Sequence, residues 1–266
     1  MQSVREQTMS RTYLVTGAAS GIGKATTALL REQGHTVIGA DLKDSDICVD
    51  LSTAEGRADL VTQARGLTGG RLDAVVACAG IAQFDALTIK VNHFGAVATL
   101  DGLRPLLAAG TDPRALVIGS IDSVHPTDPV IVDAALADDE PAAVAASQEA
   151  VDRGEGHLVY SSSKAAVSRW IRRRAITDDW AGAGIPLNAV GPGVILTPMT
   201  EPLLEDPEMR GLVERSVPMP LAGHARPEQI APLIAWLTSP ENTHVTGQVV
   251  FVDGGADAVL RGDGVW

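Results

Sequence analysis

The residues with the clearest chemical potential are Tyr160 and Lys164, a phenol and an amine four positions apart. On a helix this spacing places both side chains on one face, one turn apart. A phenol with a pKa of about 10 exchanges protons poorly at neutral pH. A neighbouring ammonium favours the phenolate and lowers that pKa, which suits a general acid or base. An ordinary amphipathic helix, with the tyrosine buried and the lysine solvated, has the same spacing. The rest of the chain has to decide between the two.

A glycine-rich loop lies near the start of the chain, between an apolar strand-like run at 11–16 and a helix-like run at 25–33. Glycines at 17, 21 and 23 permit a tight turn and the close approach of a pyrophosphate to the backbone. The amides at the start of the following helix would then face the phosphates. A lone glycine-rich loop is weak evidence, but a strand before it and a helix after it strengthen the interpretation.

Asp41 ends the next strand, 36–40, at the position where a dinucleotide-binding fold places a carboxylate for the adenosine ribose hydroxyls. A 2′-phosphate would be repelled there, and neither Ala19 nor Leu42 supplies a cation to receive one. This pattern favours NAD over NADP, although Lys24 and Lys43 lie close enough in sequence to keep NADP open. Asp41 could also be an ordinary turn residue at a strand end.

Further strand-like runs at 47–49, 72–77, 115–118, 187–190 and 248–252 alternate with helix-like runs, among them 53–66 and an apolar stretch through Asn92 to about residue 108. This alternation predicts an α/β fold, a doubly wound parallel sheet of the Rossmann type with helices on both faces. We expect a single domain over 11–266, preceded by a flexible extension at 1–10. Met9 is an alternative start.

Composition excludes several classes of function. A net charge of −12 and a pI near 4.8 argue against nucleic acid or an anionic membrane as the main partner. No signal-peptide core or membrane-spanning run is present, so we expect a cytoplasmic protein. The two cysteines, Cys48 and Cys78, have no metal-like spacing, and no metal site is predicted. The basic run 172–174 is interpreted as a solvated helix face.

In this order the pieces resemble the short-chain dehydrogenase/reductase family over about 11–255. The motifs that carry the resemblance are the 16–23 loop, Ala79-Gly80, Asn92, Ser120, Tyr160 with Lys164, Pro192-Gly193 and Thr197. The chain is also similar to the bacterial 3α-hydroxysteroid dehydrogenase/carbonyl reductase branch, through Gly34-His35, Asp41, the 51–57 run, a long insertion before Tyr160 and the 253–259 run.

The resemblance implies a role for each matched residue. Tyr160 would exchange a proton with the substrate oxygen, Lys164 would lower the pKa of Tyr160 and bind the nicotinamide ribose, Ser120 would hold the substrate oxygen, and Asn92 would belong to a proton relay through water. Thr197 would hold the nicotinamide carboxamide and Asp50 would meet the adenine. The cofactor-binding set implied is Gly17, Ser20, Gly21, Ile22, Gly23, Asp41, Leu42, Asp50, Leu51, Ala79, Gly80, Tyr160, Lys164, Pro192, Gly193, Val194 and Thr197.

Ser123 competes with Ser120 for the serine role, but Ser120 lies at the carboxyl end of its strand, where parallel-sheet sites are built. Three histidines, His93, His125 and His157, flank the site in sequence and are expected to be structural or solvated. Cys78 departs from the family's usual asparagine and so loses one polar contact.

The insertion at about 126–156 carries eight acidic residues and one base, Arg153. Its 141–153 portion is predicted to be a helix with a proline in the first turn. The insertion either decorates the surface or lies beside the site, where it would shape the substrate entrance or alter the usual dimer surface. The segment 198–226 is rich in methionine, leucine and proline and is expected to form a substrate lid, unless it is a helix pair that closes the core.

The resulting hypothesis is reversible NAD-dependent oxidation of a secondary alcohol by hydride transfer, on a bulky apolar substrate such as a 3-hydroxysteroid, by a homo-oligomer. A broad carbonyl reductase, or a dehydrogenase of small or terpenoid alcohols, is the alternative enzyme. The alternative from another class of protein is a NAD-sensing regulator that binds cofactor without turnover. Such a regulator would not need the proton-transfer residues.

Overall fold

Seven strands form one parallel sheet in the order β3-β2-β1-β4-β5-β6-β7 within residues 10–265, the part of the chain that the computed structural model describes. Residues 1–9, most of the expected flexible extension, lie outside the described residues. Every neighbouring pair is parallel; Leu14, for example, lies between Ile38 and Val75. The bounds are β1 Thr12–Thr16, β2 Thr36–Asp41, β3 Ile47–Cys48, β4 Ala74–Ala77, β5 Arg114–Ile118, β6 Leu187–Pro192 and β7 Val249–Val252. The predicted doubly wound fold is confirmed.

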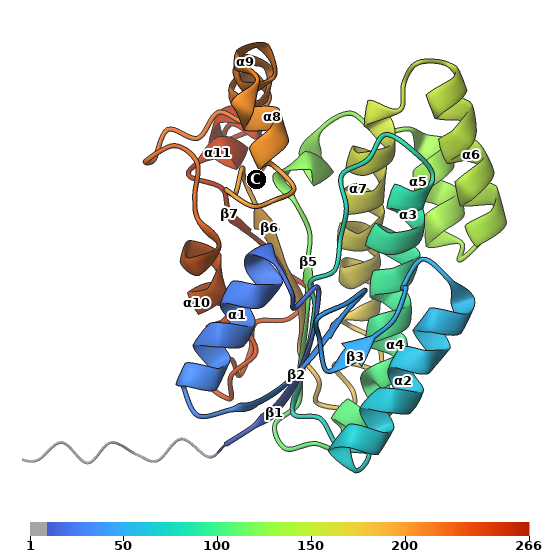
Figure 1. Cartoon of the computed structure of the whole chain (residues 1–266), viewed down its shortest axis with the longest axis vertical. Coiled ribbons are helices and arrows are strands. Elements are labelled where there is room, and N and C mark those ends of the chain that lie inside the picture. Colours follow the sequence, from blue (N-terminus) through green and yellow to red (C-terminus); the bar gives the residue numbers. More distant parts are fainter. Residues whose placement is uncertain (1–9, 266) are drawn as a thin grey trace, which may run out of the picture.

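Helices cover both faces of the sheet (Figure 1). On one face α1 (Gly21–Glu32) and α10 (Pro227–Leu237) pack over strand residues such as Tyr13 and Val15. On the other, α2 (Ala54–Thr68), α4 (Ala96–Ala108) and α7 (His157–Arg174) pack over residues such as Leu14. Successive strand residues thus point into opposite apolar layers, as a sheet buried on both faces requires.

The direction of winding changes between β1 and β4, and the loops that follow the strands gather at their carboxyl ends. In doubly wound sheets a ligand-binding crevice forms at this point. The loop after β1 leads into α1, Asp41 ends β2, Cys78 follows β4, Ser120 follows β5 and Pro192 ends β6. The fold therefore brings together segments that are far apart in the sequence.

The predicted long helix through Asn92 has three parts: α3 (Leu87–Ile89), a π-helical turn η1 (Lys90–Gly95) and α4, which contains Pro105. The π-helical turn was not predicted. Such turns insert one residue into a helix and are frequent at functional sites.

The insertion forms two helices, α5 (Pro129–Leu136) and α6 (Glu140–Asp152). The sequence predicted the second helix and missed the first. Asp128 and Asp139 cap them by accepting hydrogen bonds from the amides of Val130 and Ala142, and each helix has a proline in its first turn. The helices bury a separate apolar cluster against α7 and η1 (Figure 1), made by Ile89, Phe94, Ile131, Val132, Ala135, Ala143, Ala146, Ala150, Val159, Ala165 and Ala166. The insertion is thus part of the packed structure rather than a loose decoration.

Candidate active site

A cavity of about 480 Å³ opens at the carboxyl ends of the strands. Most of the residues proposed from the sequence line it: Gly17, Ser20, Gly21, Ile22, Gly23, Asp41, Leu42, Asp50, Leu51, Ala79, Gly80, Ser120, Tyr160, Lys164, Pro192, Gly193 and Thr197. Asn92 and Val194 are buried and do not line it. Among the described residues, no part of the insertion lines it either, so the insertion does not form the cavity wall.

The glycine-rich loop forms a close cradle beside the loop after β4. Gly17 has a φ of +67°, and a Cβ there would lie 2.9 Å from the amide nitrogen of Ala79. A Cβ on Gly23 would overlap the carbonyl oxygen of Gly17. Helix α1 begins at Gly21, and the side chain of its N-cap, Ser20, makes no capping hydrogen bond. Free amides at the start of a helix behind a glycine cradle fit a pyrophosphate group.

The Asp41 carboxylate is fixed at the edge of this cradle. One oxygen accepts a hydrogen bond from the amide of Ala19 at 3.0 Å and the other from the amide of Leu42 at 2.7 Å. Asp50 lies further along the cavity and accepts a hydrogen bond from the amide of Ser52 at 2.8 Å, and its contacts with Ser52 lower the pKa of Asp50. Both acids thus line the cavity, and their contacts with the ribose and the adenine stay predictions.

Tyr160 and Lys164 both lie on α7, as the spacing predicts, and line the cavity beside β5. The Nζ atom of Lys164 lies 5.8 Å from the Tyr160 ring centroid and donates a hydrogen bond to the carbonyl oxygen of Ile118 at 3.0 Å. Burial lowers the pKa of Lys164 to about 8, while Cys78 and Asp122 act to raise it. The amine is thus poised near neutral pH.

The expectation that Lys164 lowers the pKa of Tyr160 needs correction. Burial raises the pKa of the Tyr160 phenol, the Asp122 carboxylate raises it further, and the neighbouring Ser120 side chain acts in the opposite direction. Burial is the largest cause because the phenolate loses its hydration in an apolar wall. In this arrangement of protein groups alone, the neutral phenol is favoured.

Ser120 lines the cavity at the end of β5, whereas Ser123 does not. The Ser120 hydroxyl donates a hydrogen bond to Oδ2 of Asp122 at 2.9 Å and accepts one from the amide of Asp122 at 3.1 Å. Asp122 did not stand out in the sequence, because nothing in a lone acidic residue after a strand predicts its contact with Ser120.

Asn92 lies behind the cavity wall. Its side chain accepts a hydrogen bond from the amide of Ile81 and donates to the carbonyl oxygen of Ile81, both at 2.9 Å, and it donates to Oγ of Ser163 at 3.1 Å. A Cβ added to Gly80 would meet both Asn92 Oδ1 and Lys164 Nζ. Asn92 therefore orders the loop after β4 close to Lys164, and its place in a proton relay stays a proposal.

Val194 and Thr197 follow β6. The amide of Val194 donates to Sδ of Met219 at 3.2 Å, so this residue contacts the 198–226 segment and not the cavity. Thr197 lines the cavity, and its methyl group would meet a Cβ on Gly21, which places it opposite the glycine-rich loop.

The three histidines differ in their surroundings. His93 is buried, its Nε2 lies 3.0 Å from the carbonyl oxygen of Ala135, and burial lowers its pKa to about 4. His157 is exposed, as expected. His125 is paired with Asp122 at 3.2 Å, a contact that the sequence did not predict. Across residues 10–265 no cluster of three or more potential metal ligands occurs, and no helix there is long and apolar enough to cross a membrane.

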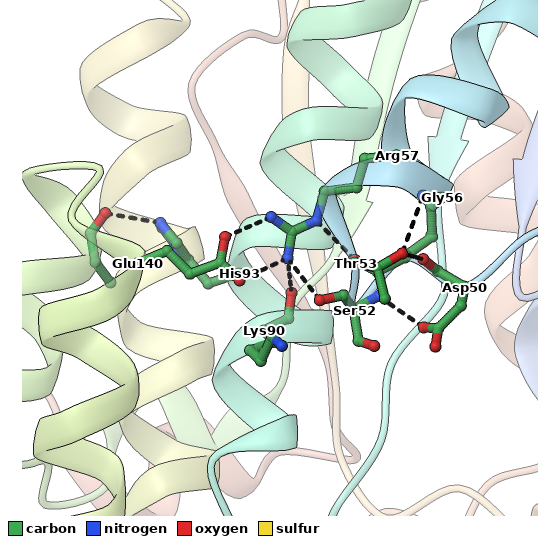
Figure 2. A network of polar contacts seen from close by, with 10 residues as sticks. Asp50, Ser52, Thr53, Gly56, Arg57, Lys90, His93 and Glu140 are labelled. Carbon is green, nitrogen blue, oxygen red and sulfur yellow. Dashed lines mark hydrogen bonds and ion pairs between the residues drawn. The ribbon is translucent and has the colours of Figure 1, made fainter.

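Figure 2 shows how Arg57 joins the insertion to the loop that carries Asp50. The Arg57 guanidinium on α2 lies between the Asp50 loop and α6. It donates to the carbonyl oxygens of Leu51 at 2.7 Å and Lys90 at 3.1 Å, and to both carboxylate oxygens of Glu140 at 2.6 and 3.0 Å. The insertion thus contacts the loop that carries Asp50 through Arg57 without entering the cavity, and the expectation that it shapes the substrate entrance or a dimer surface stays a prediction.

The order of these strands, helices and site residues along the chain is that of a known class of protein, and comparison with known proteins gives the same class. A family model described as short chain dehydrogenase matches residues 11–134, and a second, described as Enoyl-(Acyl carrier protein) reductase, matches residues 134–257. The chain belongs to the short-chain dehydrogenase/reductase family, and it is an oxidoreductase that acts on CH–OH groups.

Among its relatives is a 3-alpha-hydroxysteroid dehydrogenase/carbonyl reductase of Comamonas testosteroni, 37% identical over 93% of this chain and 97% of the relative. A 3-oxoacyl-[acyl-carrier-protein] reductase of Thermotoga maritima is 32% identical over 91% of this chain and 96% of the relative. The solved structure of a 3-alpha-hydroxysteroid dehydrogenase from Pseudomonas sp. B-0831, in complex with NADH, is 40% identical, with a TM-score of 0.88 over 95% of this chain and 99% of that one. The predicted similarity to this branch is confirmed.

Proposed function

We propose that the protein catalyses the reversible oxidation of a secondary alcohol to a ketone with NAD, on a bulky apolar substrate such as a 3-hydroxysteroid. The observation that carries the proposal is the meeting of Ser120, Tyr160 and Lys164 in a cavity that begins at the glycine-rich loop and Asp41. The names of the hydroxysteroid dehydrogenase relatives, one with NADH bound, support the substrate and the cofactor.

The cofactor would bind along the cavity floor, with its phosphates at the start of α1 and its adenosine ribose at Asp41. A 2′-phosphate would meet the Asp41 carboxylate, which is already held by two backbone amides, so NAD is favoured over NADP. Thr197 and Lys164 would contact the nicotinamide end. When bound, the nicotinamide supplies the carbon that accepts or donates hydride.

Side chains of the protein would carry out the proton transfer. Tyr160 would take the proton of the alcohol hydroxyl during oxidation and return it to the ketone oxygen during reduction. Lys164, with a pKa near 8 and its Nζ held by the carbonyl of Ile118, would offset the charge of the phenolate. Ser120 would hold the reacting oxygen beside Tyr160.

The substrate end is bordered by the 198–226 segment, which contains α8 (Glu201–Glu205) and α9 (Pro207–Ser216). Met199 lines the cavity and is half-exposed, and Ile81 on the loop after β4 and Leu87 at the start of α3 add apolar side chains to its wall. Leu204 and Val217 instead pack in a small cluster with Ile121 and Val194. The segment thus borders the cavity and also closes part of the core, and its role as a substrate lid stays a prediction.

The test is the formation of NADH by purified protein with NAD, then NADP, across steroid alcohols, terpenoid alcohols and simple secondary alcohols. Turnover of a 3-hydroxysteroid with NAD supports the full proposal. Turnover confined to small or terpenoid alcohols keeps the mechanism and rejects the steroid. Tight NAD binding without turnover of any alcohol, or of any ketone with NADH, favours the regulator. Homo-oligomerisation, expected from the resemblance, is tested by the mass in solution.

A further inference from the structure

The Ser120 hydroxyl uses most of its hydrogen-bonding capacity on one neighbour, Asp122. Ser120 is the N-cap of a short 3-10 helix, η2 (Ile121–Val124), and it is buried. Its hydrogen points at Oδ2 of Asp122, and one of its two acceptor positions is taken by the amide of Asp122. A hydroxyl has one donor and two acceptor positions. One acceptor position is therefore left, and the single hydrogen of the hydroxyl is held by Asp122.

Asp122 is itself held from the other side. Its Oδ1 lies 3.2 Å from Nδ1 of His125, and the backbone carbonyl of Ser216 lies close enough to His125 to act, with Asp122, to raise the pKa of His125. Ser216 is the last residue of α9 in the 198–226 segment. The polar groups of Ser120, Asp122 and His125 thus follow one another toward the lid, and Ile121 and Val124 of the same turn pack in one cluster with Val213 and Val217.

We propose that Asp122 and His125 are positioning residues: Asp122 fixes the Ser120 side chain at the end of β5, where it lines the cavity with Tyr160, and His125 joins Asp122 to the lid helix α9. The inference rests on the proposed alcohol oxidation, because Ser120 and Tyr160 act on the substrate oxygen only in that reaction. Neither residue was assigned a role from the sequence.

The Asp122 carboxylate also affects the charge of the reaction centre. Beside burial, it is the group that raises the pKa of Tyr160, and with Cys78 it raises the pKa of Lys164. The charged or titratable groups near this point are Asp122 from η2, His125 directly after η2, Lys164 from α7 and Cys78 after β4. Oxidation requires Tyr160 to accept a proton. A neighbouring negative charge raises the pKa of Tyr160, so the increase of the oxidation rate with pH occurs at a higher pH.

The first experiment measures the oxidation rate against pH for Asp122→Asn. The matched control is Asp133→Asn, at an exposed position on α5. Asparagine keeps the size and an acceptor oxygen but removes the charge. We expect the midpoint of the acidic limb to fall by about one pH unit in Asp122→Asn. At one pH unit below the wild-type midpoint, the oxidation rate of the variant, as a fraction of its own maximum, is then about fivefold higher than that of the wild type. An unchanged midpoint in Asp122→Asn would overturn the role of Asp122.

The second experiment uses His125→Ala, with His157→Ala as the control. We expect the KM for the alcohol to rise roughly fivefold while the KM for NAD is unchanged, because the contact with α9 is lost and the glycine-rich loop is not touched. Amide hydrogen exchange over 207–217 is expected to speed up in His125→Ala only. Equal exchange and equal KM in the two variants would contradict the contact between His125 and the lid.

The two proposals can fail separately. If the wild-type protein oxidises no alcohol, the proposed function is wrong, and hydrogen exchange still tests the lid contact without turnover. An NMR titration of His125 then tests the pair directly. Asp122 raises the pKa of His125, so this pKa is expected to fall in Asp122→Asn and to stay unchanged in Asp133→Asn. A His125 pKa that does not respond to Asp122→Asn would overturn the pairing.

Discussion

Both carboxylate oxygens of Glu140 bind the Arg57 guanidinium, at 2.6 and 3.0 Å, and so join the insertion to the loop that carries Asp50. The Arg57 side chain is largely buried, and its remaining donors hold the backbone carbonyls of Leu51 and Lys90 (Figure 2). A bidentate arginine–carboxylate contact is directional as well as strong. The insertion therefore has a structural route to the cofactor site.

Glu140→Gln is expected to weaken NADH binding severalfold and to lower the free energy of unfolding by about 1–2 kcal/mol, because a charge-assisted hydrogen bond is lost and Arg57 is left unpaired. NADH fluorescence titration and denaturant unfolding measure the two effects. Glu149→Gln, on the exposed side of the same helix, is the control and should change neither. Wild-type NADH affinity in Glu140→Gln would show that the ion pair stabilises the insertion alone.

Asp41→Asn is expected to raise the KM for NAD about tenfold and to narrow the preference for NAD over NADP. The amide has no charge to repel a 2′-phosphate, and it binds the ribose hydroxyls more weakly. A tenfold change in KM corresponds to about 1.4 kcal/mol. Asp44→Asn is the matched control, since Asp44 is exposed and its φ of 54° suits asparagine. A preference that is the same in Asp41→Asn and the wild type would remove Asp41 from cofactor selection.

The buried His93 makes stability depend on pH. Its pKa is lowered to about 4 in the fold, against about 6.5 when unfolded. Between these values the unfolded chain binds a proton that the folded chain does not, so stability is complete above pH 6.5 and falls as the pH drops toward 4. This loss amounts to about 3 kcal/mol.

Denaturant unfolding at a series of pH values checks the effect. His93→Gln removes the titration and can still donate to the carbonyl oxygen of Ala135, so its stability should fall less steeply below pH 6.5 than that of the wild type. His157→Gln, at an exposed position, should follow the wild-type curve. Parallel curves for all three proteins would mean that His93 is not the group responsible.

The sheet and most of the cavity could be predicted because apolar strands, glycine turns and helix starts are local features. Asp41 and Ser120 stand at strand ends, where a parallel sheet must place its site. Helix α5 was missed because its run at 129–132 is apolar on every side, and only packing against α7 shows it to be a helix. The π-helical turn through Asn92 depends on hydrogen-bond register, which residue types do not reveal.

The pKa of Tyr160 shows why the chemistry was harder to predict than the fold. Its spacing from Lys164 predicted a lowered pKa, whereas burial and Asp122 raise it. Burial comes from the loops around α7, and the Asp122 contact comes from the turn after β5. Both effects need the assembled structure, as does the contact between His125 and the lid.

Tyr160→Phe tests the central claim most directly, with Tyr13→Phe as the control at the only other tyrosine in the chain. Formation of NADH from NAD and the best alcohol of the panel would be measured beside NADH binding. We predict that Tyr160→Phe loses turnover by a factor of at least about 100, while NADH binding persists and Tyr13→Phe stays active. Turnover by Tyr160→Phe at the wild-type rate would contradict the proton-transfer role and the account built on it.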